Sequence, residues 1–309
     1  MTAPASGYEN IWSQLDQVLA ALERDLDGAP ADAEKSDTDF FYLFSRMLRY
    51  SPLTKPYFEK YGQPKDWAKF FRVVKTKGDD QRHQKELIIL GQKVMLPHHP
   101  HSLVYRDLIS TTLLAHSSDD TDAFIEFGAG WSANIFNLWK NGGPLDATYV
   151  GCEPTLAGRK LAERLARRQT RRCYQAAEFD YRRPDFTTIP ADCCRPLIYT
   201  CHSIEQVRTL DPRFFDHLIE STARAKSVTG VHIEPIAWQY GLDTKHFPTT
   251  PPWAIRGQQE AMWRHQNENL HTVLDDAAAR GIIRVKSIKL HSISSIKNYP
   301  TATIVWTRV

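Results

Sequence analysis

Cysteine is scarce in this sequence, and long apolar runs are missing altogether. The 309 residues include five cysteines, an odd number confined to residues 152–201, which argues against the disulfide framework of a small secreted protein. No stretch approaches the roughly 18 consecutive apolar residues of a membrane-spanning helix, and the first residues lack the basic and apolar regions of a secretory signal. We therefore expect a cytoplasmic protein that makes no membrane contact and uses its cysteines as small core residues.

A large excess of charge is absent as well. The chain has 39 basic and 36 acidic residues, which leaves a formal net charge of +3. Such a small surplus does not require a nucleic acid or an anionic membrane as partner. One expected helix carries a basic side, formed by Lys160, Arg164, Arg167 and Arg171, which is typical of a solvated surface. A small-molecule substrate is favoured over nucleic acid, and the sequence is compatible with a homodimer.

The periodicity of the chain changes near residue 120. Before that point, apolar residues recur at spacings of three and four, the pattern of amphipathic helices. The expected helices cover about residues 11–26, 36–48, 67–74, 81–94 and 103–114. No alternating strand pattern appears before Asp119, so residues 1–104 are predicted to form a helical N-terminal lid that covers the substrate.

After residue 120, short apolar runs alternate with helical stretches. The expected strands are Ala123–Phe127, Thr148–Cys152, Cys173–Ala176, Leu197–Cys201 and Val228–Ile233, with helices at 133–141, 155–170 and 212–225. Runs without clean polar alternation are typical of parallel strands covered on both faces, which place a ligand at their carboxyl ends. A long helix, about Trp253–Ala279, then precedes two strands, Arg284–Ile293 and Ala302–Arg308. Their short connection predicts antiparallel pairing.

The first of these strands ends in a glycine turn. Glu126 lies inside the apolar run, and Gly128 and Gly130 end this run before the next helix begins. Glycine at these positions allows a ligand to approach the backbone closely, and the helix that follows points its N-terminal amides at this ligand. The turn therefore predicts a site for a nucleotide-like cofactor.

This arrangement resembles the class I S-adenosylmethionine-dependent methyltransferases over residues 105–309. The resemblance implies a Rossmann-like α/β fold with a seven-stranded, mostly parallel sheet and an antiparallel last strand, and S-adenosylmethionine as cofactor. It also implies that Glu126, Gly128 and Gly130 bind the cofactor, that Glu153 holds its ribose hydroxyls, and that Asp180 lies near its adenine amino group. Glu178 is an alternative to Asp180. Trp131, which follows the second glycine, departs from the small residue that many members carry there.

A dinucleotide-dependent dehydrogenase is the alternative class of enzyme. The segment Gly128-Ala129-Gly130-Trp131-Ser132-Ala133 also satisfies the dinucleotide fingerprint, with an acid about 20 residues further on. However, Glu126 would bring a carboxylate close to a pyrophosphate, whereas a sulfonium cofactor with an ammonium group offers positive charges. The chain also shows no second α/β substrate domain, so methyl transfer is favoured.

A hydroxyl acceptor needs a base, because its proton must leave during methyl transfer. The candidate catalytic residues follow the fourth and fifth strands and are His202, Glu205 and Glu234. A histidine can take a proton at neutral pH, and Glu205 could orient it. Alternatively, His202 could only form part of the wall of the cofactor pocket. An amine acceptor would need alignment without a dedicated base. A divalent metal held by these acids and histidines is not favoured.

Candidate substrate-binding residues occur at and after the end of the fifth expected strand. They are His232, near the end of that strand, and Trp238 and Tyr240, downstream of it. The segments 202–206 and 298–301 loosely resemble bacterial sugar and small-molecule O-methyltransferases. The sequence thus favours O-methylation of a small molecule. The alternatives are N-methylation, RNA methylation and a catalytically inactive cofactor-binding partner subunit.

Overall fold

The computed structural model describes residues 5–26, 80, 82, 84–167, 172–294 and 300–309. The helices expected at 36–48 and 67–74 lie outside these residues. Helix α1 (Ala5–Leu26) confirms the first expected helix. Among the described residues, no helix combines the length and the apolar character that a membrane crossing requires.

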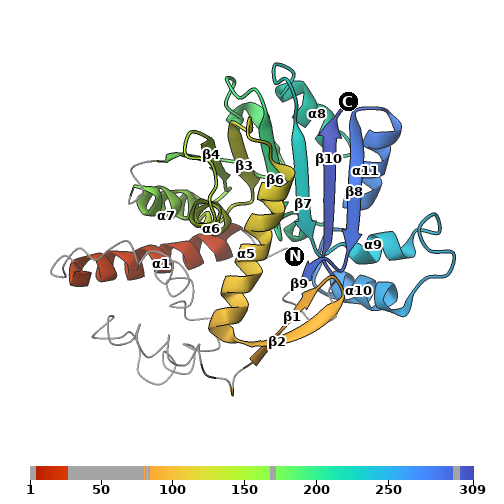
Figure 1. The fold of residues 1–309 in the computed structure, drawn as a ribbon, viewed down its shortest axis with the longest axis horizontal. Coiled ribbons are helices and arrows are strands. Elements are labelled where there is room, and N and C mark those ends of the chain that lie inside the picture. The colour runs from red at the N-terminus through yellow and green to blue at the C-terminus, as the bar shows by residue number, and fades with distance from the viewer. Residues whose placement is uncertain (1–4, 27–79, 81, 83, 168–171, 295–299) are drawn as a thin grey trace.

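A seven-stranded sheet forms the centre of the molecule (Figure 1). Its strands, in spatial order, are β5 (Cys173–Ala177), β4 (Thr148–Cys152), β3 (Ala123–Phe127), β6 (Pro196–Cys201), β7 (Thr229–Glu234), β10 (Ala302–Arg308) and β8 (Ile283–Leu290). The pairs from β5 to β7 are parallel, while β10 is antiparallel to both of its neighbours. This confirms the expected mostly parallel sheet with an antiparallel last strand.

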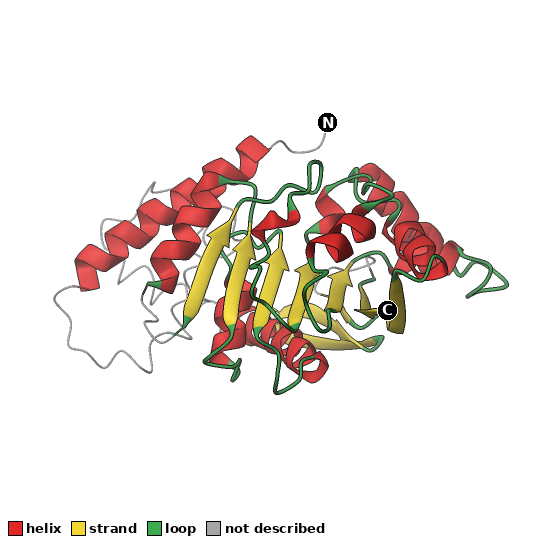
Figure 2. Ribbon diagram, turned by 90° about the horizontal axis from the view of Figure 1, so that it is seen from above, coloured by secondary structure: helices red, strands yellow, loops and turns green. Residues whose placement is uncertain are grey.

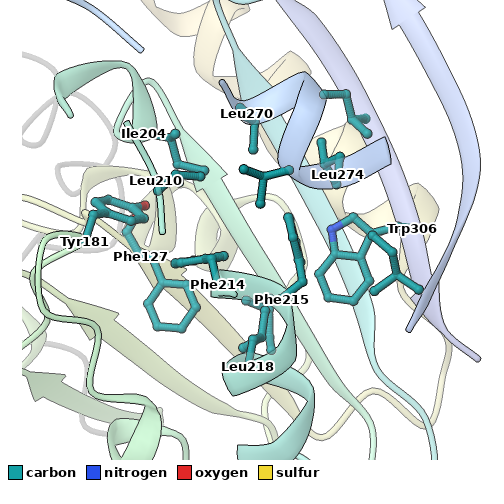
Figure 3. Close-up of a cluster of buried hydrophobic side chains, with 14 of the residues drawn as sticks. Phe127, Tyr181, Ile204, Leu210, Phe214, Phe215, Leu218, Leu270, Leu274 and Trp306 are labelled. Atoms are coloured by element: carbon teal, nitrogen blue, oxygen red, sulfur yellow. The ribbon is translucent and has the colours of Figure 1, made fainter. Parts of the chain in front are cut away.

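Helices cover both faces of this sheet. On one face lie α5 (His98–His116), α6 (Ala133–Lys140) and α7 (Leu156–Ala166), and on the other lie α8 (Phe214–Ser221) and α11 (Leu270–Ala279). Each face of the sheet has its own hydrophobic core. In β3, Phe124 packs into the core under α5, α6 and α7, while Ile125 and Phe127 pack into the core under α8 and α11. Figure 3 shows the core on the face covered by α8 and α11, where Phe215 packs edge-on against both Phe214 and Trp306. Both sides of each central strand are therefore apolar, which explains the runs without alternation.

Two strands replace the helix expected over residues 81–94. They are β1 (Gln84–Ile89) and β2 (Gln92–Pro97), and β1 also pairs with β9 (Ile293–Ser294) in a separate three-stranded sheet. The two-residue turn between them has positive φ at both Leu90 (48°) and Gly91 (78°). Such a turn matches the twist of a hairpin, and Gly91 is the signal that the helical interpretation missed.

The long helix expected over Trp253–Ala279 is also wrong, because it is divided into α10 (Pro252–Trp263) and α11. Asn267 lies in the break. Its side-chain oxygen accepts hydrogen bonds from the amides of Asn269 (3.1 Å) and Leu270 (2.8 Å), and its nitrogen donates to the carbonyl of Val207 (3.0 Å). The break brings residues 264–266 to the pocket described below.

Short helices complete the described fold. They are η2 (Phe186–Thr188), η3 (Ile204–Gln206) and α9 (Ala237–Leu242). Helix α5 runs without interruption through the boundary expected between residues 104 and 105. On α7, the apolar side is buried as expected, and Arg164 pairs with Asp16 of α1 at 3.0 Å. This ion pair places α1 against the outer face of α7.

Candidate active site

A pocket with a volume of about 350 Å³ opens at the carboxyl ends of β3, β4 and β6. This is where an open parallel sheet places its ligand. The first helix after the N-terminus passes close to this edge of the sheet (Figure 2). Tyr8 and Trp12 of α1 line the pocket. The Tyr8 hydroxyl donates a hydrogen bond to Oε1 of Gln206 (3.2 Å), and the carboxylate of Glu9 accepts one from the amide of Ala157 (3.1 Å).

The glycine turn forms the floor of the pocket. Gly128 and Gly130 have φ values of +73° and +58°, the left-handed region that favours glycine. The amide of Gly128 donates to the carbonyl of Cys152 at 2.8 Å, which ties the turn to the end of β4. A Cβ on Gly128 would lie 2.3 Å from the Cβ of Ser203. The turn therefore accepts only a glycine where β3 meets the loop after β6.

Glu153 ties the second strand end to this turn. Its Oε2 accepts a hydrogen bond from the amide of Gly130 (2.9 Å), and its Oε1 accepts one from the hydroxyl of Thr155 (2.6 Å). Burial raises the pKa of Glu153, although these hydrogen bonds oppose the shift. Each carboxylate oxygen has two lone pairs, so the group keeps acceptor capacity toward the pocket.

Glu126 lies in β3, just before the turn, and is 1% exposed. The side-chain amide of Asn134, from α6, donates to its Oε1 at 2.6 Å, and the hydroxyl of Tyr199 donates to its Oε2 at 3.3 Å. Burial raises the pKa of Glu126 to about 8. A carboxyl with this pKa holds its proton at pH 7 and can release it when a cation arrives.

His202 projects from the loop that follows β6. Its φ is +52°, and its amide donates to the carbonyl of Ile233 at 3.1 Å. Its Nδ1 lies 3.6 Å from Oε2 of Glu205, while its Nε2 is buried without a hydrogen-bond partner among the described residues. Burial lowers the pKa of His202, but Glu205, with a further contribution from Glu234, outweighs burial and leaves the pKa raised.

Glu234 lies behind this loop and does not line the pocket. Its Oε1 accepts hydrogen bonds from the amides of Ser203 (3.1 Å) and Ile204 (3.2 Å). Burial raises the pKa of Glu234 to about 7, and the neighbouring carboxylate of Glu205 adds to the shift. The structure thus places Glu234 as a support for the loop, away from the catalytic position expected from the sequence.

The three expected substrate-binding residues are also away from the pocket lining. His232 is enclosed in the core, where Trp306 Nε1 donates to its Nε2 (2.8 Å) and its Nδ1 lies 3.0 Å from the Thr200 hydroxyl. Burial lowers its pKa to about 3. Trp238 packs against α10, and Tyr240 packs against α11. Both nitrogens of His232 are already in contact with protein partners, so this ring cannot contact a substrate.

Asp180 lines the pocket, and its Oδ1 accepts a hydrogen bond from the amide of Arg182 at 2.9 Å. The alternative residue, Glu178, instead pairs with Arg159 at 2.9 Å and is 74% exposed. Of the two acids considered from the sequence, Asp180 is the one that the structure brings to the pocket.

Several lining residues were not expected from the sequence. They are Tyr8 and Trp12 on α1, Asn134 on α6, Gln206 on η3, and Arg264, His265 and Gln266 between α10 and α11. Tyr8 and Gln206 are 198 residues apart in the chain. No local pattern marks them, because their approach depends on how distant elements pack.

The order of the features decides the fold. A glycine turn ends the central parallel strand β3, an acid follows β4, and the last strand β10 runs antiparallel beside β7. The chain has the class I methyltransferase fold. No protein-family profile matches the sequence, and no curated protein matches it either.

Solved structures that are similar to this methyltransferase fold include three enzymes. Geranyl diphosphate C-methyltransferase from Streptomyces coelicolor A3(2) is 14% identical, covers 84% of this chain and 99% of its own, and has a TM-score of 0.46. Magnesium protoporphyrin IX methyltransferase from Synechocystis PCC 6803 is 9% identical, with 67% and 83% covered and a TM-score of 0.41. A SAM-dependent methyltransferase from Aquifex aeolicus is 13% identical, with 68% and 94% covered and a TM-score of 0.41. These similarities assign no substrate.

Proposed function

We propose that the protein is an S-adenosylmethionine-dependent methyltransferase that methylates a hydroxyl group of a small molecule. The observation that carries this proposal is the position of His202. Its buried Nε2 has no hydrogen-bond partner among the described residues, its Nδ1 lies beside Glu205, and both residues line the pocket that contains the glycine turn.

The pocket residues fit the cofactor. The turn at Gly128 and Gly130 forms a cradle whose positive φ values disfavour any side chain. Glu153 offers acceptor oxygens for a ribose diol, and Glu126 offers a carboxyl that can become negative beside an ammonium or sulfonium group. When bound, S-adenosylmethionine supplies a methyl group that is already activated by the positive sulfur.

The chain's own residues then have two tasks. The first is to align the acceptor and to exclude water, which the strand ends and α1 perform by enclosing the pocket. The second is to remove the acceptor proton. His202 Nε2 is the atom that would take it, and the carboxylate of Glu205 would stabilise the imidazolium that results.

The cover formed by α1 favours a small acceptor. Tyr8 and Trp12 stack with ring centroids 6.0 Å apart and face the pocket. Their aromatic rings are suited to close over a compact molecule. In this proposal residues 1–104 act as the lid, and residues 105–309 form the cofactor-binding core.

The proposal is tested first by calorimetry with S-adenosylhomocysteine and then by turnover. A saturable 1:1 complex is expected, whereas absence of binding would overturn the methyltransferase assignment. The acceptor is sought by incubating cell extracts with a cofactor whose methyl group is labelled and identifying the compound that gains the label.

His202→Ala then tests the base. On a hydroxyl acceptor, kcat should fall by about 10²- to 10⁴-fold, while the affinity for S-adenosylhomocysteine should change little. The matched control is His217→Ala, because His217 pairs with Glu220 at the same 3.6 Å and the same spacing but lies exposed on α8. Full turnover in His202→Ala would show that His202 is not the base, and it would favour N-methylation by proximity, which needs no dedicated base.

A further inference from the structure

A second cluster of chemically active side chains lies between α9 and α11, outside the pocket. Asp243 follows the end of α9, His246 lies in the next turn, and His271 and Asp275 are one turn apart on α11. None of the four residues lines the proposed active site. Among the described residues, Asp243, His246 and His271 are the group whose ligand atoms all lie within 4.8 Å of one another.

Two of the separations within this cluster match those between ligands of a single metal ion, and the third is longer. His271 Nε2 lies 3.4 Å from Asp243 Oδ2 and 3.4 Å from Asp275 Oδ2, and His246 Nε2 lies 3.9 Å from Asp243 Oδ2. These distances are longer than ordinary hydrogen bonds, which span about 2.7–3.2 Å. Two ligands that are each about 2.0–2.1 Å from a tetrahedral Zn²⁺ are roughly 3.3–3.4 Å apart.

The nitrogen at the centre of the cluster lacks a partner. Nε2 of His271 is buried and makes no hydrogen bond to any of the described residues, although the side chain as a whole is 12% exposed. A buried polar atom without a partner costs free energy unless a ligand satisfies it. An ion between His271 and the two aspartates would do so.

The surrounding structure holds the ligands in place. The amide of Lys245 donates to Asp243 Oδ1 at 2.8 Å, which leaves Oδ2 facing the histidines. The amide of His271 donates to Oε1 of Gln239 at 2.9 Å, so that α9 and α11 are joined next to the cluster. The ring of Tyr240 packs edge-on against both histidines, with its centroid 4.2 Å from that of His271.

A network of ion pairs without a metal is the competing explanation. Lys245 Nζ lies 3.9 Å from Asp275 Oδ2, and it could neutralise one of the two carboxylates. However, Lys245 is 78% exposed, and its contact with Asp275 leaves Nε2 of His271 without a hydrogen bond. The lysine therefore neutralises charge at the rim of the cluster and does not fill its centre.

We propose that Asp243, His246 and His271 bind a divalent transition-metal ion of the Zn²⁺ class, with Asp275 beside the site. Two imidazoles with a carboxylate suit Zn²⁺, whereas Ca²⁺ and Mg²⁺ prefer oxygen ligands alone. The ion has a structural role, because it joins the connection between α9 and α10 to α11. Since the site lies outside the pocket, the proposal is independent of the proposed methyl transfer.

The test uses the full chain without a histidine tag, freed of metal with a chelator and titrated with ZnCl₂ by calorimetry. We expect one site per chain, a higher Tm with Zn²⁺ than after chelation, and no competition from Mg²⁺ or Ca²⁺. Co²⁺ in place of Zn²⁺ should give the intense visible absorption of a tetrahedral complex. Loss of an outer-shell partner costs about 10- to 100-fold in metal affinity, so loss of a ligand should cost at least as much.

Two variants identify the ligands, and one serves as control. His271→Ala and His246→Ala should each abolish or strongly weaken Zn²⁺ binding, while His217→Ala, whose side chain lies on the outer side of α8, should bind as the wild type does. His246 is exposed, so its variant tests the site even if His271→Ala does not fold. The proposal is overturned if the wild type shows no saturable Zn²⁺ binding, or if His246→Ala binds Zn²⁺ with unchanged affinity.

Discussion

Nδ1 of His202 lies 3.6 Å from Oε2 of Glu205, and the opposite ring nitrogen of the same histidine is buried without a hydrogen-bond partner among the described residues. One side of the imidazole therefore faces a carboxylate, while the other is free to take a proton. In the proposed reaction, His202 would act as the base and Glu205 would orient it. The positive φ of His202 (52°) turns the side chain out of the line of β6 and towards the pocket.

The pH dependence of turnover should reveal this pair. Because Glu205 outweighs burial and raises the pKa of His202, the imidazole should lose its proton only above the ordinary value near 6.5. A base must be unprotonated, so kcat should rise with pH through that raised pKa. Glu205→Gln removes the carboxylate and leaves the effect of burial, so the acidic limb should move to lower pH. A limb that stays in place in this variant would contradict the pairing.

Cofactor binding should release a proton from Glu126. Burial raises the pKa of this carboxyl to about 8, so it is protonated in the free protein at pH 7. A positive ammonium or sulfonium group nearby would lower that pKa and favour the ionised form. Calorimetry in buffers of different ionisation enthalpy should therefore detect close to one proton released per cofactor bound. Glu126→Gln keeps the hydrogen-bonding shape and should abolish the release; an unchanged release would assign the proton elsewhere.

Glu153→Ala should weaken the binding of S-adenosylhomocysteine. The variant removes the ribose acceptor and also leaves the amide of Gly130 without its partner. Hydrogen bonds to charged groups contribute about 1.5–3 kcal/mol each, which corresponds to a loss of affinity of roughly 10- to 100-fold. The control is Glu178→Ala, because Glu178 is exposed and pairs with Arg159. Equal affinities in the two variants would count against the ribose contact.

Gly128→Ala should destabilise the fold more than Gly142→Ala. Both glycines have positive φ, +73° and +88°, so an alanine at either position suffers about 1–2 kcal/mol of backbone strain. A Cβ at Gly142 would meet no atom within 4 Å, whereas one at Gly128 would lie 2.3 Å from Ser203. Overpacking should add about 1–3 kcal/mol to the loss at Gly128. Urea denaturation of both variants measures the difference, and equal free energies of unfolding would refute the close contact.

Local sequence was a reliable guide where burial on both faces makes a strand apolar throughout. The bounds expected for β3, β4 and β10 are those of the structure. Local sequence was a poor guide at the hairpin of β1 and β2, where residues 81–94 were interpreted as a helix. The turn at Leu90 and Gly91 makes this segment a hairpin. A signal from two residues is weak beside a helical pattern that extends over 14 residues.

The same distinction applies within the site. The sequence alone was enough to place Glu126, Gly128, Gly130, Glu153 and His202 at strand ends, because parallel strands bring their carboxyl ends to one edge of a sheet. It could not decide whether His202 or His232 faces the substrate, since both occur near the carboxyl end of an apolar run. The structure separates them: His232 is paired with Trp306 and Thr200 inside the core, whereas His202 stands beyond the end of its strand.

The sequence by itself determined the alternation of helices and strands, the position of the glycine turn and the acids beside it, because these depend on local backbone and burial requirements. Only the tertiary structure decided what encloses the pocket. Tyr8 and Trp12 reach it from α1, and residues 264–266 reach it because the chain breaks between α10 and α11, where Asn267 accepts a hydrogen bond from the amide of Leu270. Contacts between elements this far apart depend on how whole helices pack, and no short segment carries that information.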